Sequence, residues 1–331
     1  MTKKILDASR MRRGDIILTS SNNKISKAIR VMTSSEVSHA ALWIDNGFII
    51  DAVKEGVFSS NPERLAFDLS DCVYVLRLKE SLSDERLDKI IRYAQDQIGS
   101  RYSIKEAILT KLTKPPATRK QFCSRLVAQA YSQAGVFVSR EPDYCKPSDI
   151  LESQLFSYVE NPTKEISEEF LTSYNEALPA IKNNMDYSTQ QVLKKVREID
   201  NSIETLNDVN LFLLNNRNRD EEIYSIYIKS KYCEVYKIEL GRHPWRYIPG
   251  QIDTVANSNK EEIIDYYKKT CGPESDILKR YTKKLRFYEK IHETTKLKTF
   301  LLLKQLYKTL VDNERIRLKI ARDWAKRNCI E

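Results

Sequence analysis

The hydrophobic and polar positions of the first half of the chain follow two different periods. Short apolar runs bounded by glycine, aspartate and asparagine predict strands near residues 14–18, 37–44, 48–53 and 72–79. Apolar residues at helical spacing predict helices near residues 23–32, 83–98, 103–112 and 122–135. Ser83 followed by two acidic residues is a good helix start. Strands mixed with helices in this way predict an α+β domain.

The second half of the chain has a different hydrophobic pattern. From about residue 163 the strand signals fade and amphipathic helical patterns dominate, at 181–206, at 263–267 and along 274–326, with a break near Thr294 and Thr295. One stripe has the spacing expected for a helical bundle: Phe300, Leu303, Tyr307, Leu310 and Val311. The stretch 136–162 holds three prolines, and we take it as a closing segment and linker. For 331 residues we therefore expect two domains, an α+β domain over 1–158 and an α-helical domain over 159–331.

Composition narrows the class of protein. Hydrophobic residues make up 41% and charged residues 31% of the chain, which is ordinary for a globular protein. There is no long uncharged apolar run, and the first residues are too polar for a signal peptide, so we expect a cytoplasmic protein without a transmembrane segment. The six cysteines form no CxxC pair and the three histidines are dispersed, so we expect a reducing compartment, no disulfide framework, and neither metal nor cofactor.

The positive charge is concentrated at one end. Residues 278–328 hold 16 Lys or Arg against 5 Asp or Glu, a local balance of +11 in a chain whose net charge is +9. Such a stretch suits an anionic membrane surface, a nucleic acid or an acidic protein partner. The plainer alternative is a solvated helix face, and no nucleic-acid-binding motif is present.

Cys123 is a candidate nucleophile. Two prolines, Pro115 and Pro116, keep the preceding stretch from being helical, and helical spacing begins at Phe122 and ends before Gly135. Cys123 therefore falls in the first turn of a helix, where unpaired backbone N–H groups lower the pKa of a thiol. A cysteine in an apolar helix is more often a small core residue, so this position needs a partner to become a candidate site.

His39 is the candidate partner, at the start of the apolar strand 37–44. If residues 45–47 form a three-residue hairpin loop with Gly47 in the left-handed position, Ala41 pairs with Asp51 and the Asp51 side chain shares a face with His39. An acid there would hold the imidazole in the tautomer that leaves its other nitrogen free for the thiol. A two-residue turn would instead send Asp51 to the opposite face, and Asp45 and Glu55 are nearby alternatives.

The two segments come in the order His then Cys, whereas papain-like enzymes usually run Cys then His, which indicates a circular permutation. The chain resembles the permuted papain-like amidases of the YiiX/YaeF type, within the wider NlpC superfamily. The resemblance rests on five segments in order, over about residues 10–155: 13–18, 38–44, 48–57, 98–102 and 122–127. It implies an NlpC-type domain with an antiparallel sheet and a nucleophile helix. It also implies Cys123 as nucleophile, His39 as base, Asp51 as orienting acid, and Tyr102 and Ser124 as substrate-binding residues.

Three positions depart from the family pattern and bear on the substrate. The third catalytic residue is often Glu, and here it is Asp51. An Asp commonly follows the tyrosine, and here it is Ser103. The residue after Ser124 is often Glu, and here it is Arg125.

Two classes of function follow. The first is a cysteine hydrolase that cleaves an amide or an acyl (thio)ester of a peptide-type or acyl substrate through an acyl-thioester on Cys123, or an acyltransferase on the same scaffold. The second is an inactive papain-like shell that binds a partner through its basic helical half. A reactive Cys123 distinguishes them, because an inert shell predicts no cysteine that stands out from the other five.

Overall fold

The computed structural model describes residues 3–20, 35–44, 48–60, 66–103, 106, 118–167, 179–272 and 277–330. The chain divides into two compact units. The first comprises Met1–Pro179 together with Ser202–Asn207, and the second comprises Ala180–Asn201 and Asp208–Glu331. From the sequence we expected domains of 1–158 and 159–331. In the structure the first unit extends to Pro179, and it also includes the short segment Ser202–Asn207 from far along the chain.

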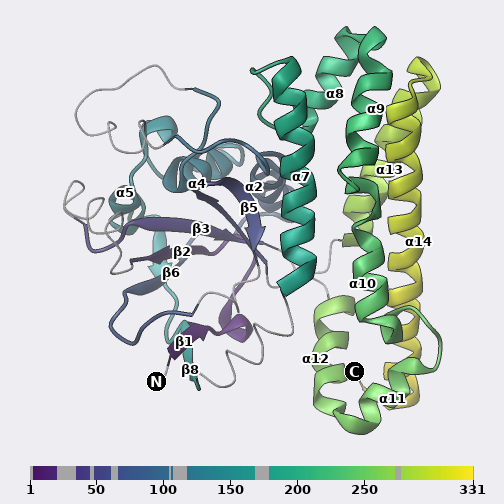
Figure 1. The fold of residues 1–331 in the computed structure, drawn as a ribbon. Helices are drawn as coiled ribbons and strands as arrows, with labels where there is room; N and C mark the ends of the chain where they lie inside the picture. Colours follow the sequence, from purple (N-terminus) through teal and green to yellow (C-terminus); the bar gives the residue numbers. More distant parts are fainter. Residues whose placement is uncertain are drawn as a thin grey trace. The chain divides into compact units, whose positions relative to one another are not determined.

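The centre of the first unit is an antiparallel sheet with the strand order β5-β4-β3-β2-β6-β7 (Figure 1). Its strands are β2 (Ile16–Thr19), β3 (His39–Trp43), β4 (Ile49–Val53), β5 (Gly56–Ser60), β6 (Val73–Leu78) and β7 (Phe156–Tyr158). A separate two-stranded sheet joins β1 (Lys3–Leu6) to β8 (Thr163–Ile166). The sheet is apolar on both faces, because its central strands alternate between two hydrophobic clusters.

One of these clusters lies between the sheet and two helices, α2 (Asp84–Asp96) and α4 (Cys123–Ser132). Leu42 and Ile50 belong to it, together with Leu126 and Val127 of α4. The other cluster covers the opposite face and contains, among others, Trp43. The N-terminal half is therefore an α+β domain, as expected, in which α4 packs directly on the sheet.

Most predicted elements of this unit are found with small shifts at their ends. Ser83 caps α2, its Oγ accepting a hydrogen bond from the Arg86 N–H at 3.4 Å. The interpretation of 136–162 as a linker is wrong, because β7 lies in it and pairs with β6 as an edge strand of the main sheet. The helices expected at 23–32 and 103–112 fall outside the described residues, apart from Ser103 and Glu106.

The second unit is helical, as predicted. Its helices are α7 (Pro179–Ile199), α8 (Leu206–Asn215), α9 (Asp220–Lys229), α10 (Tyr236–Arg242), α11 (Gln251–Ser258), α12 (Lys260–Cys271), α13 (Ile277–Thr295) and α14 (Lys298–Arg327). Helices α13 and α14 lie side by side as a hairpin (Figure 1), and the chain turns between them at Lys296, whose φ is 58°. The break expected near Thr295 is thus confirmed. Along the predicted stripe Phe300, Leu303 and Val311 are buried. In the described part of the chain, no helix combines the length and apolarity needed to cross a bilayer.

Candidate active site

Cys123 is the first residue of α4. The preceding residue, Phe122, is extended with φ −141° and ψ 163°, and no side chain caps the helix start. The first backbone N–H groups of α4 therefore keep the partial positive charge of a helix N-terminus at the position of the thiol. Cys123 is 4% exposed and belongs to the cluster between α4 and the sheet. The local sequence places it there, because the helical spacing starts at Phe122.

His39 and Asp51 form a pair on neighbouring strands. Strand β3 pairs with β4 so that Ala41 lies opposite Asp51, Leu42 opposite Ile50 and Trp43 opposite Ile49. This is the register expected for the three-residue loop, and it brings Nε2 of His39 to 3.2 Å from Oδ2 of Asp51. The Asp51 side chain is 9% exposed and the His39 side chain 31%. With Nε2 engaged by Asp51, Nδ1 is the ring nitrogen that remains for the thiol.

The interactions between Cys123 and His39 favour a thiolate on the cysteine and an imidazolium on the histidine. Burial alone would raise the pKa of Cys123, but the hydrogen bond and charge of His39 outweigh it, with help from the backbone at Ala40 and Ser124, and the thiol pKa is lowered. Burial alone would lower the pKa of His39, but its hydrogen bonds to Asp51 and Cys123 raise that pKa to about 10. Each group thus stabilises the charged form of the other, which is the state a thiol nucleophile requires.

Tyr102 lies at the same site. Its side chain packs against the hydrophobic cluster that contains Cys123. Its pKa is raised, first by burial and then by the charge of Cys123. Its backbone forms an isolated parallel bridge with Gln121, two residues before Cys123. Ser124 is placed differently. It is 1% exposed, and its Oγ donates to the carbonyl of Cys145 at 2.7 Å. Its side chain is therefore engaged inside the protein, and what Ser124 presents toward Cys123 is its backbone.

Of the alternatives to Asp51, Glu55 is exposed and Asp45 lies outside the described residues.

Among the described residues no group of three or more His, Cys, Asp or Glu side chains is arranged to hold a metal ion. The cysteines of the described chain are all free thiols.

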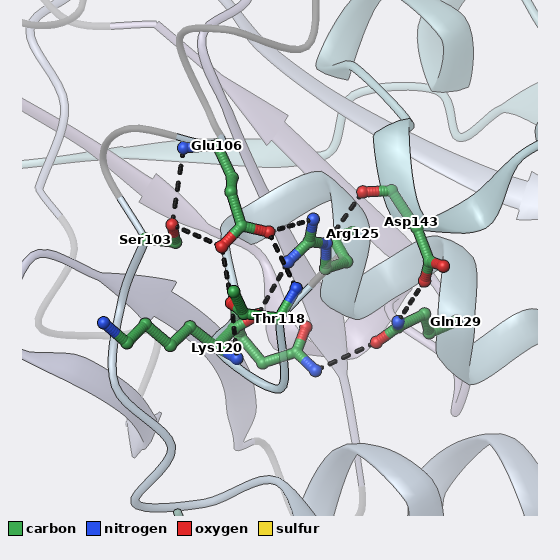
Figure 2. Close-up of polar contacts among 8 residues, drawn as sticks. Ser103, Glu106, Thr118, Lys120, Arg125, Gln129 and Asp143 are labelled. Carbon is green, nitrogen blue, oxygen red and sulfur yellow. Dashed lines mark hydrogen bonds and ion pairs between the residues drawn. The ribbon is translucent and has the colours of Figure 1, made fainter. Parts of the chain in front are cut away.

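Two of the three positions that depart from the family pattern meet at a residue that the sequence did not single out, Glu106. Its carboxylate forms an ion pair with Arg125 at 2.6 Å and accepts hydrogen bonds from the hydroxyls of Ser103 and Thr118 (Figure 2). Arg125 is fully buried within α4, two residues after Cys123. These hydrogen bonds and this ion pair outweigh the cost of burial and lower the pKa of Glu106.

Arg125 also fixes the chain on both sides of α4. Its Nη1 donates to the carbonyl of Lys120 at 2.8 Å and its Nε donates to the carbonyl of Asp143 at 2.7 Å (Figure 2). The ring of Phe122 packs against the guanidinium at 4.5 Å. A planar fork of donors suits this task, since one side chain satisfies three acceptors at fixed angles. Sequence spacing gave no signal for the contacts, because Glu106 and Arg125 come from separate segments.

The N-terminal half of the chain is similar to a family of known proteins. Residues 10–172 match the family model described as "Permuted papain-like amidase enzyme, YaeF/YiiX, C92 family". This N-terminal part of the chain is a domain of that permuted papain-like amidase family. A structural neighbour is the crystal structure of a protein titled metalloprotein yiiX from Escherichia coli O157:H7, at 20% identity and a TM-score of 0.35, covering 45% of this chain and 97% of the neighbour. No curated protein matches the sequence.

Proposed function

We propose that the protein is a cysteine-dependent hydrolase of amides or acyl (thio)esters, with Cys123 as nucleophile, His39 as base and Asp51 as the orienting acid. The observation that carries the proposal is the His39–Asp51 pair at 3.2 Å beside a thiol at the first turn of α4. The family match over residues 10–172 supports the same class of enzyme. Acyl transfer would use the same acyl-thioester with an amine or alcohol in place of water.

The reaction follows from the protonation states. The Cys123 thiolate attacks the carbonyl carbon of the substrate, and the carbonyl oxygen takes up the negative charge. The free backbone N–H groups at the start of α4 are suitable donors for that oxyanion. The His39 imidazolium gives its proton to the leaving group as the bond to the amine or alcohol breaks, leaving an acyl-thioester. Neutral His39 then removes a proton from the attacking water, and the thiolate leaves.

The intermediate provides the test. The protein is mixed with a panel of small amide, ester and thioester substrates, quenched in acid and analysed by intact mass and peptide mapping. The proposal predicts an acyl group on Cys123 for at least one class, and its absence in Cys123→Ala, whose fold is checked by circular dichroism. Turnover that persists in Cys123→Ala would contradict the proposal.

We also propose that the basic end binds an anionic partner along one face of α14. Four exposed cations recur there at helical spacing, namely Arg315, Lys319, Arg322 and Lys326. Retention on heparin, a polyanion, tests this. The double variant Lys319→Glu/Arg322→Glu is expected to elute at clearly lower salt than the wild type. The matched control is Lys194→Glu/Lys195→Glu, which changes the charge equally at exposed positions of α7. If both double variants elute at the same salt concentration, the assignment of binding to this face of α14 is contradicted.

A further inference from the structure

The backbone on either side of Tyr102 is hydrogen-bonded to Gln121, in the segment that leads into α4. The Gln121 N–H donates to the Arg101 carbonyl at 2.9 Å, and the Ser103 N–H donates to the Gln121 carbonyl at 2.9 Å. Residues 101–103 are therefore hydrogen-bonded to the entry of α4, and Tyr102 lies between the two hydrogen bonds. The position of Tyr102 at the entry to α4 depends on what holds its two neighbours, Arg101 and Ser103.

A buried carboxylate holds each neighbour. On one side, Glu106 accepts from the hydroxyl of Ser103 at 2.8 Å and pairs with Arg125 (Figure 2). On the other side, Glu204 accepts from Arg101 through the backbone N–H at 3.0 Å, through Nε at 2.9 Å and through Nη2 at 2.6 Å. The Glu204 side chain is 5% exposed. A carboxylate that is buried and bound by both the backbone and the guanidinium fork fixes a position more firmly than a surface ion pair does.

Glu204 comes from a part of the chain that the family match does not cover. It belongs to the segment Ser202–Asn207, which the structure groups with the first unit, whereas the match ends at residue 172. Ile203 and Thr205 on either side of it are also buried, at 2% and 5% exposure. Asn207 donates to Asp96 of α2 at 3.0 Å. The middle of the segment, residues 203–205, is thus buried, and Asn207 links the segment to α2.

We infer that Glu204 is a positioning residue of the active site, which holds Tyr102 at the entry to α4 through Arg101. The segment Ser202–Asn207 accordingly supports the site from outside the family domain. The inference rests on the proposed function, since it assigns Tyr102 to the wall of a working thiol site.

A double-mutant cycle on the full-length protein tests the link. Cys123 is alkylated with iodoacetamide and with the bulkier N-(1-naphthyl)iodoacetamide, and the ratio of the two second-order rate constants reports on the wall beside the sulfur. The variants are Glu204→Ala, Tyr102→Ala and the double variant. A matched control is Glu314→Gln in the second unit, where the carboxylate is 6% exposed and pairs with Arg317 at 2.8 Å.

The expected result is a change of at least about threefold in the rate ratio for Glu204→Ala and for Tyr102→Ala, with the double variant equal to Tyr102→Ala alone. Glu314→Gln is expected to keep the wild-type ratio, although it lowers stability. Should Glu204→Ala fail to fold, Glu204→Leu takes its place in the cycle, because it fills a similar volume but offers Arg101 no acceptor.

Two results would overturn the inference: effects of Glu204 and Tyr102 that multiply independently, or a Glu204 variant with the same ratio as Glu314→Gln. A failure of the proposed function looks different. In that case Cys123 of the wild type is not selectively alkylated at all, whereas a failure of the positioning role leaves a reactive Cys123 that does not respond to Glu204.

Discussion

Replacing Asp51 by Asn removes the acid that accompanies His39. The Nε2–Oδ2 contact of 3.2 Å involves a carboxylate that is 9% exposed, and a hydrogen bond to a charged group of this kind is worth about 1.5–3 kcal/mol. Because 1.36 kcal/mol corresponds to one pH unit, the loss lowers the pKa of His39 by about 1–2 units from its value of about 10. Burial, which opposes the imidazolium, remains in the variant and acts in the same direction.

The chain is well suited to measuring this effect. It contains three histidines, so the imidazole signals in an NMR titration are few, and His39→Gln assigns the one of interest. Asp51→Asn is expected to move the His39 midpoint downward, whereas Glu55→Gln, which removes an exposed acid in the turn after β4, is expected to leave it in place. An unchanged midpoint in Asp51→Asn, or an equal shift in both variants, would refute the assignment of Asp51 as the partner.

Three further substitutions test the packing around the site. Glu106→Gln leaves the buried Arg125 without its counter-charge and is expected to cost about 3–5 kcal/mol in urea unfolding, whereas an exposed acid such as Glu55 should cost almost nothing. Gly14→Ala places a Cβ at φ +87° and 2.9 Å from Leu87, so we expect a loss of about 1–3 kcal/mol, and an unchanged urea midpoint would contradict the strain. Phe300→Ala, at a fully buried position of α14, is expected to cost about 3–5 kcal/mol without altering the alkylation rate of Cys123, and a changed rate would argue against that independence.

The pairing of β3 with β4 shows which part of the site the sequence predicts and which part it leaves open. Alternation placed His39 at the start of a strand, but the turn allowed two registers, and only one of them puts Asp51 on the face of His39. The pairing of Ala41 with Asp51 decides between them. The local sequence is compatible with either turn and cannot make this decision, because a one-residue slip changes only which face of the sheet each side chain occupies.

The residues around Tyr102 lie beyond what the sequence reveals. Arg125 and Ser103 stood out only as departures from a family pattern, and their common partner Glu106 has no periodic signal. Glu204 is 103 positions from Arg101 along the chain, so no local pattern relates the two. The three-residue strand β7 was missed for a related reason, because a run so short shows no measurable alternation next to prolines.

Alkylation of the cysteines across pH tests the central claim most directly. The six thiols are labelled with iodoacetamide and quantified separately by mass spectrometry, in the wild type and in His39→Ala. Because the Cys123 pKa is lowered from the ordinary 9.0, its thiolate persists on the acid side of that value and disappears only as pH falls further. We predict that Cys123 labels faster than the other five at neutral pH and that His39→Ala removes this advantage. A Cys123 that labels no faster than the others, or that is indifferent to His39, would contradict the thiolate–imidazolium pair.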